Sequence, residues 1–350
     1  MKATIRVTNR LPREYRFAHG YSLFLYDLLL AILKEGDQAE IYNHKFQLKS
    51  PDHRKQIKKL RAEELLNWLT QNNYQSEAYL IIYKQLVPGL ISDLCYYIYM
   101  SLVSSATAYI RVSYSLFRRP FKDTLLLLEW LLAYPAEMLH LFIQSDNSKH
   151  YAPDQLTHER KREIISKSIE KIGKSNILDA ELIYRLRYEK SFNSGFERFW
   201  QPASHIVTNA KDYATEPMDL NYVFQTPEQF GGCWNHIYSF VPMILYYVLN
   251  VAETLVSTFA HRKDAHLDIT DKRVDMGLIL WLKSMLPLGL EGYTDEHIQS
   301  FSMLLDGFTL KFQCEECPSK EYSINQRQLL MFYKYGQLRC AACKATRSLI

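Results

Sequence analysis

The sequence predicts a mainly α-helical protein that ends in a small, β-rich zinc module. Long stretches repeat apolar residues at helical spacing, whereas clean alternation of apolar and polar residues is scarce. Four of the six cysteines form two Cys-x-x-Cys pairs close to the C-terminus. We therefore expect a helical body over residues 1–305 and a zinc ribbon over residues 306–350.

The composition is that of a folded protein with a large core. Of the residues, 47% are apolar and 23% charged, which is ordinary for a globular chain. The length of 350 residues is enough for one large domain or two unequal ones. The net charge of +4 permits nucleic-acid binding but is too small to diagnose it. The sequence has no Gly-rich phosphate loop, His-Glu-x-x-His or Gly-x-Ser-x-Gly motif, so the enzyme classes that depend on them have no support.

Apolar periodicity places helices through most of the body, and cap residues support several of them. Ser50 and Pro51 precede a basic helix, and Thr157 and Gly173 bracket another. Short strands are expected only at the two ends, at ATIRV (3–7) and FTLKFQC (308–314). Residues 144–156 and 212–232 are expected to be long loops. The expected helices are 21–34, 54–71, 76–86, 89–117, 121–143, 157–172, 176–193, 203–212, 234–260, 273–285 and 295–305.

The most apolar stretch, residues 237–259, is long enough to cross a bilayer. It contains Pro242, Asn250 and Glu253, and a charged residue is costly at the middle of a membrane. We therefore interpret it as a buried helix. No targeting segment is evident, and the cysteine pairs are typical of metal sites in reducing compartments. We expect a cytoplasmic protein without a membrane partner.

The cysteine pairs CEEC and CAAC are separated by 22 residues. Two residues between cysteines let both thiolates reach one ion, and two such pairs complete a tetrahedron. We expect a structural Zn²⁺ bound by Cys314, Cys317, Cys340 and Cys343. Four protein ligands leave no open position for water, so this metal would not be catalytic.

The function of the zinc module remains open between several roles. Zinc ribbons bind nucleic acids, bind proteins or staple a chain terminus. The basic residues around the cysteines fit a surface that contacts phosphates, but a solubilising face accounts for them equally well. These residues are Lys311, Lys320, Arg327, Lys334, Arg339, Lys344 and Arg347.

A polar stripe crosses the apolar stretch 108–135. Its members recur at offsets of about three, four or seven residues, so one continuous helix would place them in a single line. Glu129 stands out because it lies among leucines and needs a partner there. Either the stripe is a solvated face whose cations pair with acids, or it faces an anionic substrate with Glu129 orienting the cations. The stripe comprises Arg111, Ser115, Arg118, Lys122 and Glu129.

Arg198 and His205 stand seven positions apart in ERFWQPASHIVTN, with Pro202 between them. Because Pro202 would clash with the carbonyl of Arg198, we expect a helix to begin at Pro202 with Gln201 as its cap. His205 would then lie in the first turn, where free amides attract phosphate and the helix dipole favours neutral imidazole. His205 would be a general base and Arg198 a transition-state stabiliser. Alternatively, the histidine bonds a carbonyl and the arginine pairs with an acid.

An all-helical body that carries an arginine, four to six residues and then a histidine resembles the HEPN superfamily, which includes prokaryotic toxin and antiphage ribonucleases. The stretch LFRRPFKDTLLLLEWLL also resembles one in uncharacterised helical bacterial proteins associated with that superfamily. The resemblance implies that Arg198 and His205 form a catalytic pair supported by Glu129 or Arg118. It also implies a homodimer that cleaves RNA without metal through the ribose 2′-hydroxyl. The spacing is at the upper limit for the family, and Pro202 departs from its regular helix.

Two functions are therefore expected. The first is a metal-independent endoribonuclease of a bacterial defence or toxin system, in which His205 is acid or base, Arg198 stabilises the phosphorane and the zinc ribbon holds RNA. The alternative is a non-enzymatic adaptor whose body dimerises and whose zinc ribbon recognises a nucleic acid or a protein.

Overall fold

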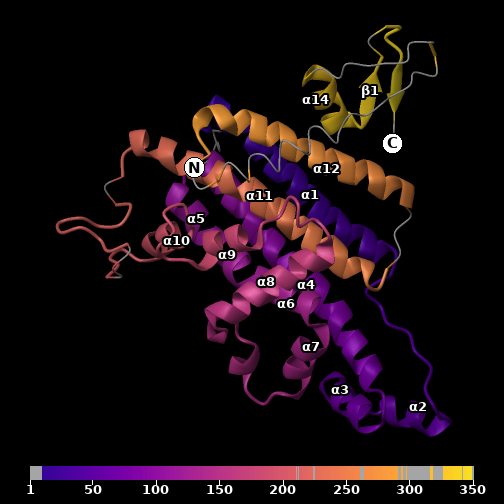
Figure 1. The fold of residues 1–350 in the computed structure, drawn as a ribbon. Coiled ribbons are helices and arrows are strands. Elements are labelled where there is room, and N and C mark those ends of the chain that lie inside the picture. The colour runs from indigo at the N-terminus through magenta and orange to yellow at the C-terminus, as the bar shows by residue number, and fades with distance from the viewer. Residues whose placement is uncertain are drawn as a thin grey trace, which may run out of the picture.

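The computed structural model describes residues 10–209, 211, 213–223, 225–260, 264–290, 293–294, 297, 316–317, 326–340 and 342–348. Within these residues the chain is mainly helical, as the sequence predicts (Figure 1). The α-helices are α1 (Arg16–Gln38), α2 (Pro51–Ile57), α3 (Ala62–Gln71), α4 (Gln75–Ala106), α5 (Ile110–Arg118), α6 (Leu125–Ala133), α7 (Pro135–Gln144), α8 (His158–Ile172), α9 (Ala180–Tyr188), α10 (Glu197–Ser204), α11 (Phe230–Ser257), α12 (Asp264–Met285) and α14 (Gln326–Tyr335).

Shorter elements connect the helices. A π-helical turn, η2 (Arg119–Thr124), joins α5 to α6. The 3-10 turns are η1 (Arg13–Tyr15), η3 (Ser148–Tyr151), η4 (Pro153–Gln155), η5 (Pro227–Gln229) and η6 (Leu286–Leu288). Strands β1 (Gln337–Arg339) and β2 (Thr346–Ser348) pair antiparallel, with Leu338 opposite Arg347. The strands expected at 3–7 and 308–314, and the helix expected at 295–305 except for His297, lie outside the described residues.

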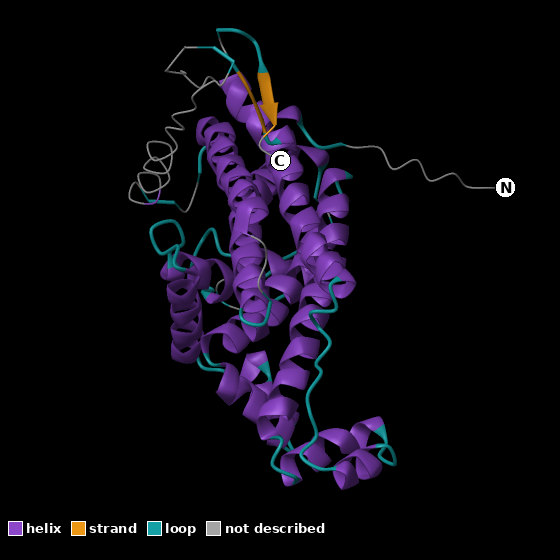
Figure 2. Cartoon of the chain, turned by 90° about the vertical axis from the view of Figure 1, so that its right-hand side faces the viewer, coloured by secondary structure: helices purple, strands orange, loops and turns teal. Residues whose placement is uncertain are grey.

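The body is built around α11, which packs against α1, α4, α6, α8 and α12. Figures 1 and 2 show α1, α11 and α12 running side by side along the molecule, with α14 and the two strands at one end and α2 with α3 at the other. Because neighbours surround α11, almost every residue from Cys233 to Val256 is buried. A helix that is apolar on all sides, as α11 is in the sequence, is typical of such a buried position.

Three stretches of the described chain are long and apolar enough to cross a membrane, by length and composition alone: Arg13–Gln38, Gln75–Ala106 and Pro227–Ser257. The pair Ile110–Ala133 and Pro135–Gln144, bent by 115°, would be a fourth if counted as one span. In the third stretch 89% of the apolar window is buried inside the protein, against 33% and 39% in the first two. The stretch interpreted from sequence as a buried helix is therefore enclosed by the chain's own helices.

The cap residues act as the sequence predicts. The Ser50 hydroxyl accepts a hydrogen bond from the His53 amide at 3.2 Å, and the Thr157 hydroxyl accepts one from the Arg160 amide at 3.2 Å. Gly173 ends α8 in the left-handed conformation, with φ of 76°. These side chains satisfy amides that the first helical turn leaves without a partner.

Several helix boundaries differ from the sequence expectation. Two helices were expected at 76–86 and 89–117, but α4 runs from one into the other through Pro88, and the chain instead breaks after Ala106, where Ala108 has φ of 66°. The expected helix 54–71 is divided into α2 and α3, and the expected helix 121–143 is divided at Tyr134, beside Pro135. The residues flanking Pro88, among them Val87 and Ile91, are buried in the core, and their packing outweighs the hydrogen bond that proline removes.

Candidate functional site

Helix α10 carries Arg198 and ends immediately before His205, which corrects the helix expected at 203–212. The helix runs from Glu197 to Ser204 with Pro202 inside it, and residues 205–209 are not helical. Its last carbonyls are held by α5, because the Ser115 hydroxyl donates to the Ala203 carbonyl at 3.0 Å. His205 therefore lies at the carbonyl end of α10, where the dipole is negative, and not beside the free amides that were expected to attract phosphate.

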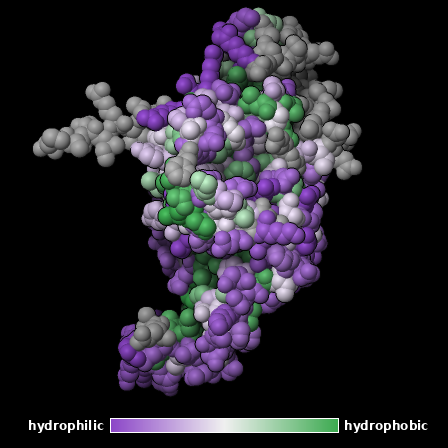
Figure 3. Space-filling view, turned by 90° about the vertical axis from the view of Figure 1, so that its left-hand side faces the viewer, coloured by the Kyte–Doolittle hydropathy of each residue, from purple (hydrophilic) through white to green (hydrophobic). Residues whose placement is uncertain are grey.

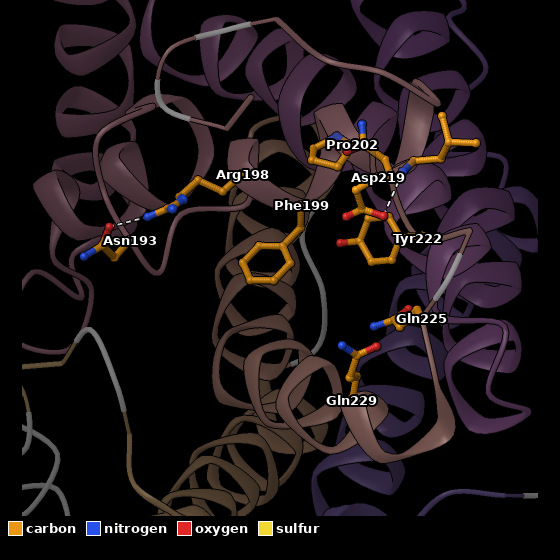
Figure 4. A pocket seen from close by; sticks show the side chains of 10 residues that line it. Asn193, Arg198, Phe199, Pro202, Asp219, Tyr222, Gln225 and Gln229 are labelled. Carbon is orange, nitrogen blue, oxygen red and sulfur yellow. Dashed lines mark hydrogen bonds between the residues drawn. The ribbon is translucent and has the colours of Figure 1, made fainter. Parts of the chain in front are cut away.

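Arg198 lines a pocket of about 670 Å³. Figure 4 shows the Arg198 side chain pointing toward Asn193 and away from Phe199, with Tyr222, Gln225 and Gln229 on the other side of Phe199. The guanidinium donates to the Asn193 side-chain oxygen. The described residues that line it are Asn193, Arg198, Phe199, Pro202, Asp219, Leu220, Asn221, Tyr222, Gln225 and Gln229.

His205 is exposed and is not among the residues that line this pocket. Its carbonyl accepts a hydrogen bond from the Asn221 amide group at 2.8 Å, and the Asn221 backbone amide donates to the Ile206 carbonyl at 2.8 Å. These bonds fix the chain after α10 against the loop that closes the pocket. The structure thus places Arg198 in the pocket and His205 at the far end of the same helix.

His236 lies behind Phe199, one of the residues that line the pocket, and was missed by sequence reasoning. Its ring stacks on Phe199 with centroids 3.8 Å apart. Nε2 lies 2.9 Å from the Ser194 carbonyl and therefore carries the proton, so that Nδ1 accepts from the Tyr114 hydroxyl at 3.0 Å. Burial lowers the pKa of His236 to about 4. The only sequence signal is a histidine inside an apolar helical run, which is typical of a core histidine.

Glu129, expected to assist catalysis, is fully buried and paired with Arg187. Two bonds of 2.5 and 3.0 Å join the guanidinium to the carboxylate. Arg187 Nε also donates to the Phe121 carbonyl at 2.5 Å, and the Tyr188 hydroxyl donates to the Lys122 carbonyl at 2.6 Å. Both carbonyls belong to the π-helical turn η2, so this buried network holds the turn in place. Glu129 is not brought to Arg198 or His205.

The rest of the polar stripe faces α10. Lys122 is paired with Glu197, a carboxylate that is only 2% exposed, and Arg111 Nε donates to the Ala203 carbonyl at 3.3 Å. Arg118 is half-buried, and its Nε has no hydrogen-bond partner among the described residues. Arg111, Ser115 and Lys122 therefore attach the helix that carries Arg198. Of the stripe's cations, Lys122 pairs with an acid as one alternative expected, but Glu129 and the Glu197 partner of Lys122 are buried, so the stripe is not the solvated face of that alternative.

Near the C-terminus, the Sγ atoms of Cys317, Cys340 and Cys343 all lie within 4.8 Å of one another. Cys317 Sγ and Cys340 Sγ are 3.8 Å apart. Zn–S bonds of about 2.3 Å in a tetrahedron place neighbouring sulfurs roughly 3.8 Å apart, so this spacing fits one zinc ion. The Cys343 amide donates to Cys340 Sγ at 3.2 Å, which stabilises a thiolate. Cys314, the fourth expected ligand, lies outside the described residues.

Comparison of the chain with protein-family models, with curated proteins and with solved structures gave no match. The functional argument therefore depends on the pocket and the cysteine cluster alone.

Proposed function

We propose that the protein binds single-stranded RNA and that the Arg198 pocket receives one unstacked base. The observation that carries this proposal is the pocket's lining, which combines aromatic rings with side-chain amides. Proteins that recognise single-stranded RNA stack bases on aromatic rings and bond their edges with polar side chains. The pocket volume of about 670 Å³ is in the range of small-ligand sites.

The charges of the lining favour a base over a phosphate. Arg198 is the one cation of the lining and Asp219 the one carboxylate, so the two offset each other. The Gln229 side-chain oxygen accepts the Thr226 amide at 2.9 Å, which directs its NH₂ group elsewhere, and the Gln225 NH₂ group lies 3.3 Å from Cys233 Sγ. The NH₂ group of Gln229, the oxygen of Gln225 and the Tyr222 hydroxyl are then available to a heterocycle.

In this proposal the body is a HEPN-like domain and the C-terminal segment a zinc ribbon with a structural role. The three gathered thiols support one Zn²⁺, with Cys314 as its fourth ligand. Arg327, Lys334, Arg339 and Lys344, all in the described part of that segment, are exposed and supply charge for the RNA backbone.

The test measures the affinity for a labelled single-stranded RNA and for an abasic strand of the same length. We expect the abasic strand and the Arg198→Ala variant each to bind about tenfold or more weakly, since one stacked and hydrogen-bonded base contributes about 1–3 kcal/mol. Lys55→Ala, which removes an exposed charge from α2, is the matched control. Equal affinity for both strands would exclude a base site.

A second candidate is the metal-independent endoribonuclease, formed by two copies of the chain. The observation in its favour is that Arg198 lies in the first turn of α10 and His205 directly follows its last residue, about 10 Å away along the axis of a helix that Pro202 does not break. Exposed apolar residues, Tyr109, Val112, Ile206 and Val207, lie around this end of α10, since Arg111 is bonded to Ala203. Figure 3 shows hydrophobic patches on the otherwise hydrophilic face on this side of the molecule. A homodimer over these residues would bring two His205 side chains to one cleft.

In that reaction the ribose 2′-hydroxyl attacks the adjacent phosphorus while the His205 of one copy accepts its proton. The bond from phosphorus to the 5′-oxygen breaks, and the protonated His205 of the second copy donates a proton to that oxygen, which leaves a 2′,3′-cyclic phosphate and a 5′-hydroxyl end. We expect a 2′-O-methyl RNA to resist cleavage and His205→Ala to abolish it while the fold is retained. If RNA stays intact after prolonged incubation with the wild-type dimer, the endoribonuclease is excluded and RNA binding is the one proposed function left.

A further inference from the structure

A second, strongly cationic pocket of about 820 Å³ lies where the body meets the C-terminal segment. Its lining includes Arg13 and Arg16 from the beginning of the body, Arg273 from α12 and Lys334 from α14. Among the lining residues that the structure describes there is no carboxylate. This pocket is built from other elements than the Arg198 pocket, and its charge differs: its described lining has four cations and no carboxylate, whereas that of the Arg198 pocket has one cation and one carboxylate.

Arg273 is the side chain that assembles this pocket. Its Nε donates to the Tyr333 carbonyl at 2.9 Å and its Nη2 to the Lys334 carbonyl at 3.1 Å, so it holds the last turn of α14. The guanidinium also lies over the Phe24 ring, 5.1 Å from the centroid. Burial lowers the pKa of Arg273, which is the cost of placing a cation here without a carboxylate.

The cations of this pocket lack counter-ions within the described chain. None of the four makes an ion pair with a carboxylate of the described residues, although ion pairs are numerous elsewhere on the surface. Glu14, the acid of η1, is not part of the lining, and the first turn of α1 has no acidic residue. Four cations that converge without an anion repel one another, and a bound polyanion removes that repulsion.

The wall beside the cations is aromatic. Phe17 and Phe24 are partly buried at the pocket, and Tyr333 packs against both with ring centroids 5.7 and 5.2 Å apart. Aromatic faces next to arginines accept a flat heterocycle, and the arginines accept phosphate oxygens in a bidentate manner. The volume is sufficient for a molecule of nucleotide size.

We propose that this pocket binds the phosphates of a nucleotide, with its base against the phenylalanine wall. The nucleotide is either free or the phosphorylated 5′ end of an RNA chain, since both offer the same chemistry. This site is separate from the proposed base site at Arg198 and does not depend on it.

The experiment uses the full-length, metal-loaded protein in calorimetric titrations. The ligands are ATP, AMP, inorganic phosphate and a short single-stranded RNA with either a 5′-phosphate or a 5′-hydroxyl. We expect micromolar binding of ATP or of the 5′-phosphorylated RNA. The Arg13→Gln/Arg16→Gln variant, altered at two exposed positions, should bind at least about tenfold more weakly. Lys34→Gln/Lys149→Gln removes the same charge at exposed positions outside the pocket and should bind as wild type.

The outcomes distinguish a free nucleotide from the 5′ end of an RNA chain, and they distinguish failure of this site from failure of the base site at Arg198. Binding of ATP identifies a free nucleotide, whereas tighter binding of the 5′-phosphorylated RNA than of the 5′-hydroxyl RNA, without binding of ATP, identifies a chain end. Arg198→Ala should leave ATP binding unchanged and should weaken the RNAs with a 5′-phosphate and with a 5′-hydroxyl by the same factor, so a loss of base recognition cannot be mistaken for failure of this site. Equal binding by the double arginine variant and its control, or binding of inorganic phosphate as strong as that of ATP, overturns the proposal.

Discussion

At the scale of single residues, the ion pair of Glu129 and Arg187 makes the sharpest prediction. Both side chains are fully buried, and Arg187 also satisfies the Phe121 carbonyl. Glu129→Gln leaves Arg187 as a buried cation without an anion, so we expect a loss of about 3–5 kcal/mol in the free energy of unfolding. Denaturant titration followed by circular dichroism measures it.

Its control is Glu170→Gln on the surface of α8. The Glu170 carboxylate accepts from Lys167 at 2.8 Å, but both groups are exposed to water, and solvent screens them. We expect the denaturant concentration at the midpoint of unfolding to be almost the same as for the wild type. Similar losses for the two variants would mean that burial does not distinguish the pairs.

Sequence reasoning recognised that Glu129 needed a partner but could not name it. Arg187 stands 58 positions further along the chain, and in the sequence it is one arginine among many. Neither residue type nor spacing indicates which cation reaches a buried carboxylate, because this depends on how α6 and α9 pack. The gathering of Cys317, Cys340 and Cys343 was predicted more easily, since the Cys-x-x-Cys spacing itself encodes a local turn.

His236 predicts how stability depends on pH. Its pKa is about 4 in the folded protein, below the ordinary 6.5 of an unfolded chain. The unfolded chain therefore binds more protons between these values, and stability falls as the pH drops from 6.5 toward 4, by on the order of 3 kcal/mol from this group. His236→Gln keeps a donor for the Ser194 carbonyl but does not titrate, and should show a shallower pH dependence over this range.

At the scale of elements, the π-helical turn η2 requires donors from α9. The Tyr188 hydroxyl donates to the Lys122 carbonyl and accepts from Arg187 at 2.9 Å. Tyr188→Phe keeps the ring but leaves that carbonyl without this donor, at a cost of about 1–3 kcal/mol in unfolding free energy. Tyr96→Phe on α4, whose side chain is 74% exposed, is the matched control and should unfold like the wild type.

The elements also show where sequence patterns fail. Helices with a polar face and explicit caps, such as α8, have the predicted ends because the signals are local. At two prolines the prediction was wrong. Helix α4 continues through Pro88, where two separate helices were expected, and α10 continues through Pro202, where a helix was expected to begin. In both helices packing holds the chain through the missing hydrogen bond, and packing depends on residues distant in sequence. The helix break at Ala108 has no neighbouring glycine or proline in the sequence from which it could have been predicted.

At the scale of the whole molecule, the C-terminal segment is attached to the body through aromatic contacts. Tyr333 of α14 is buried against Tyr21 and Phe24 of α1. A Cβ atom at Gly277 of α12 would collide with the rings of Tyr21 and Tyr333, so this glycine provides the space in which α14 docks. The sequence predicts the cysteine cluster of the segment but not this contact. In the sequence, Gly277 is only a glycine inside a helix, and nothing marks it as the place where another helix packs.

Gly277→Ala therefore tests whether docking of α14 builds the cationic pocket. In most helix interiors the change to alanine stabilises by about 0.5–1 kcal/mol, and Gly89 in α4, with open space around it, should behave so. At Gly277 the added methyl group displaces Tyr333, which carries with it the carbonyl held by Arg273 and the neighbouring Lys334. We expect Gly277→Ala to weaken nucleotide binding at least about tenfold while zinc content stays at one ion per chain, because the thiols lie outside the contact. Unchanged nucleotide affinity together with a melting temperature raised as in Gly89→Ala would show that the pocket forms without this contact.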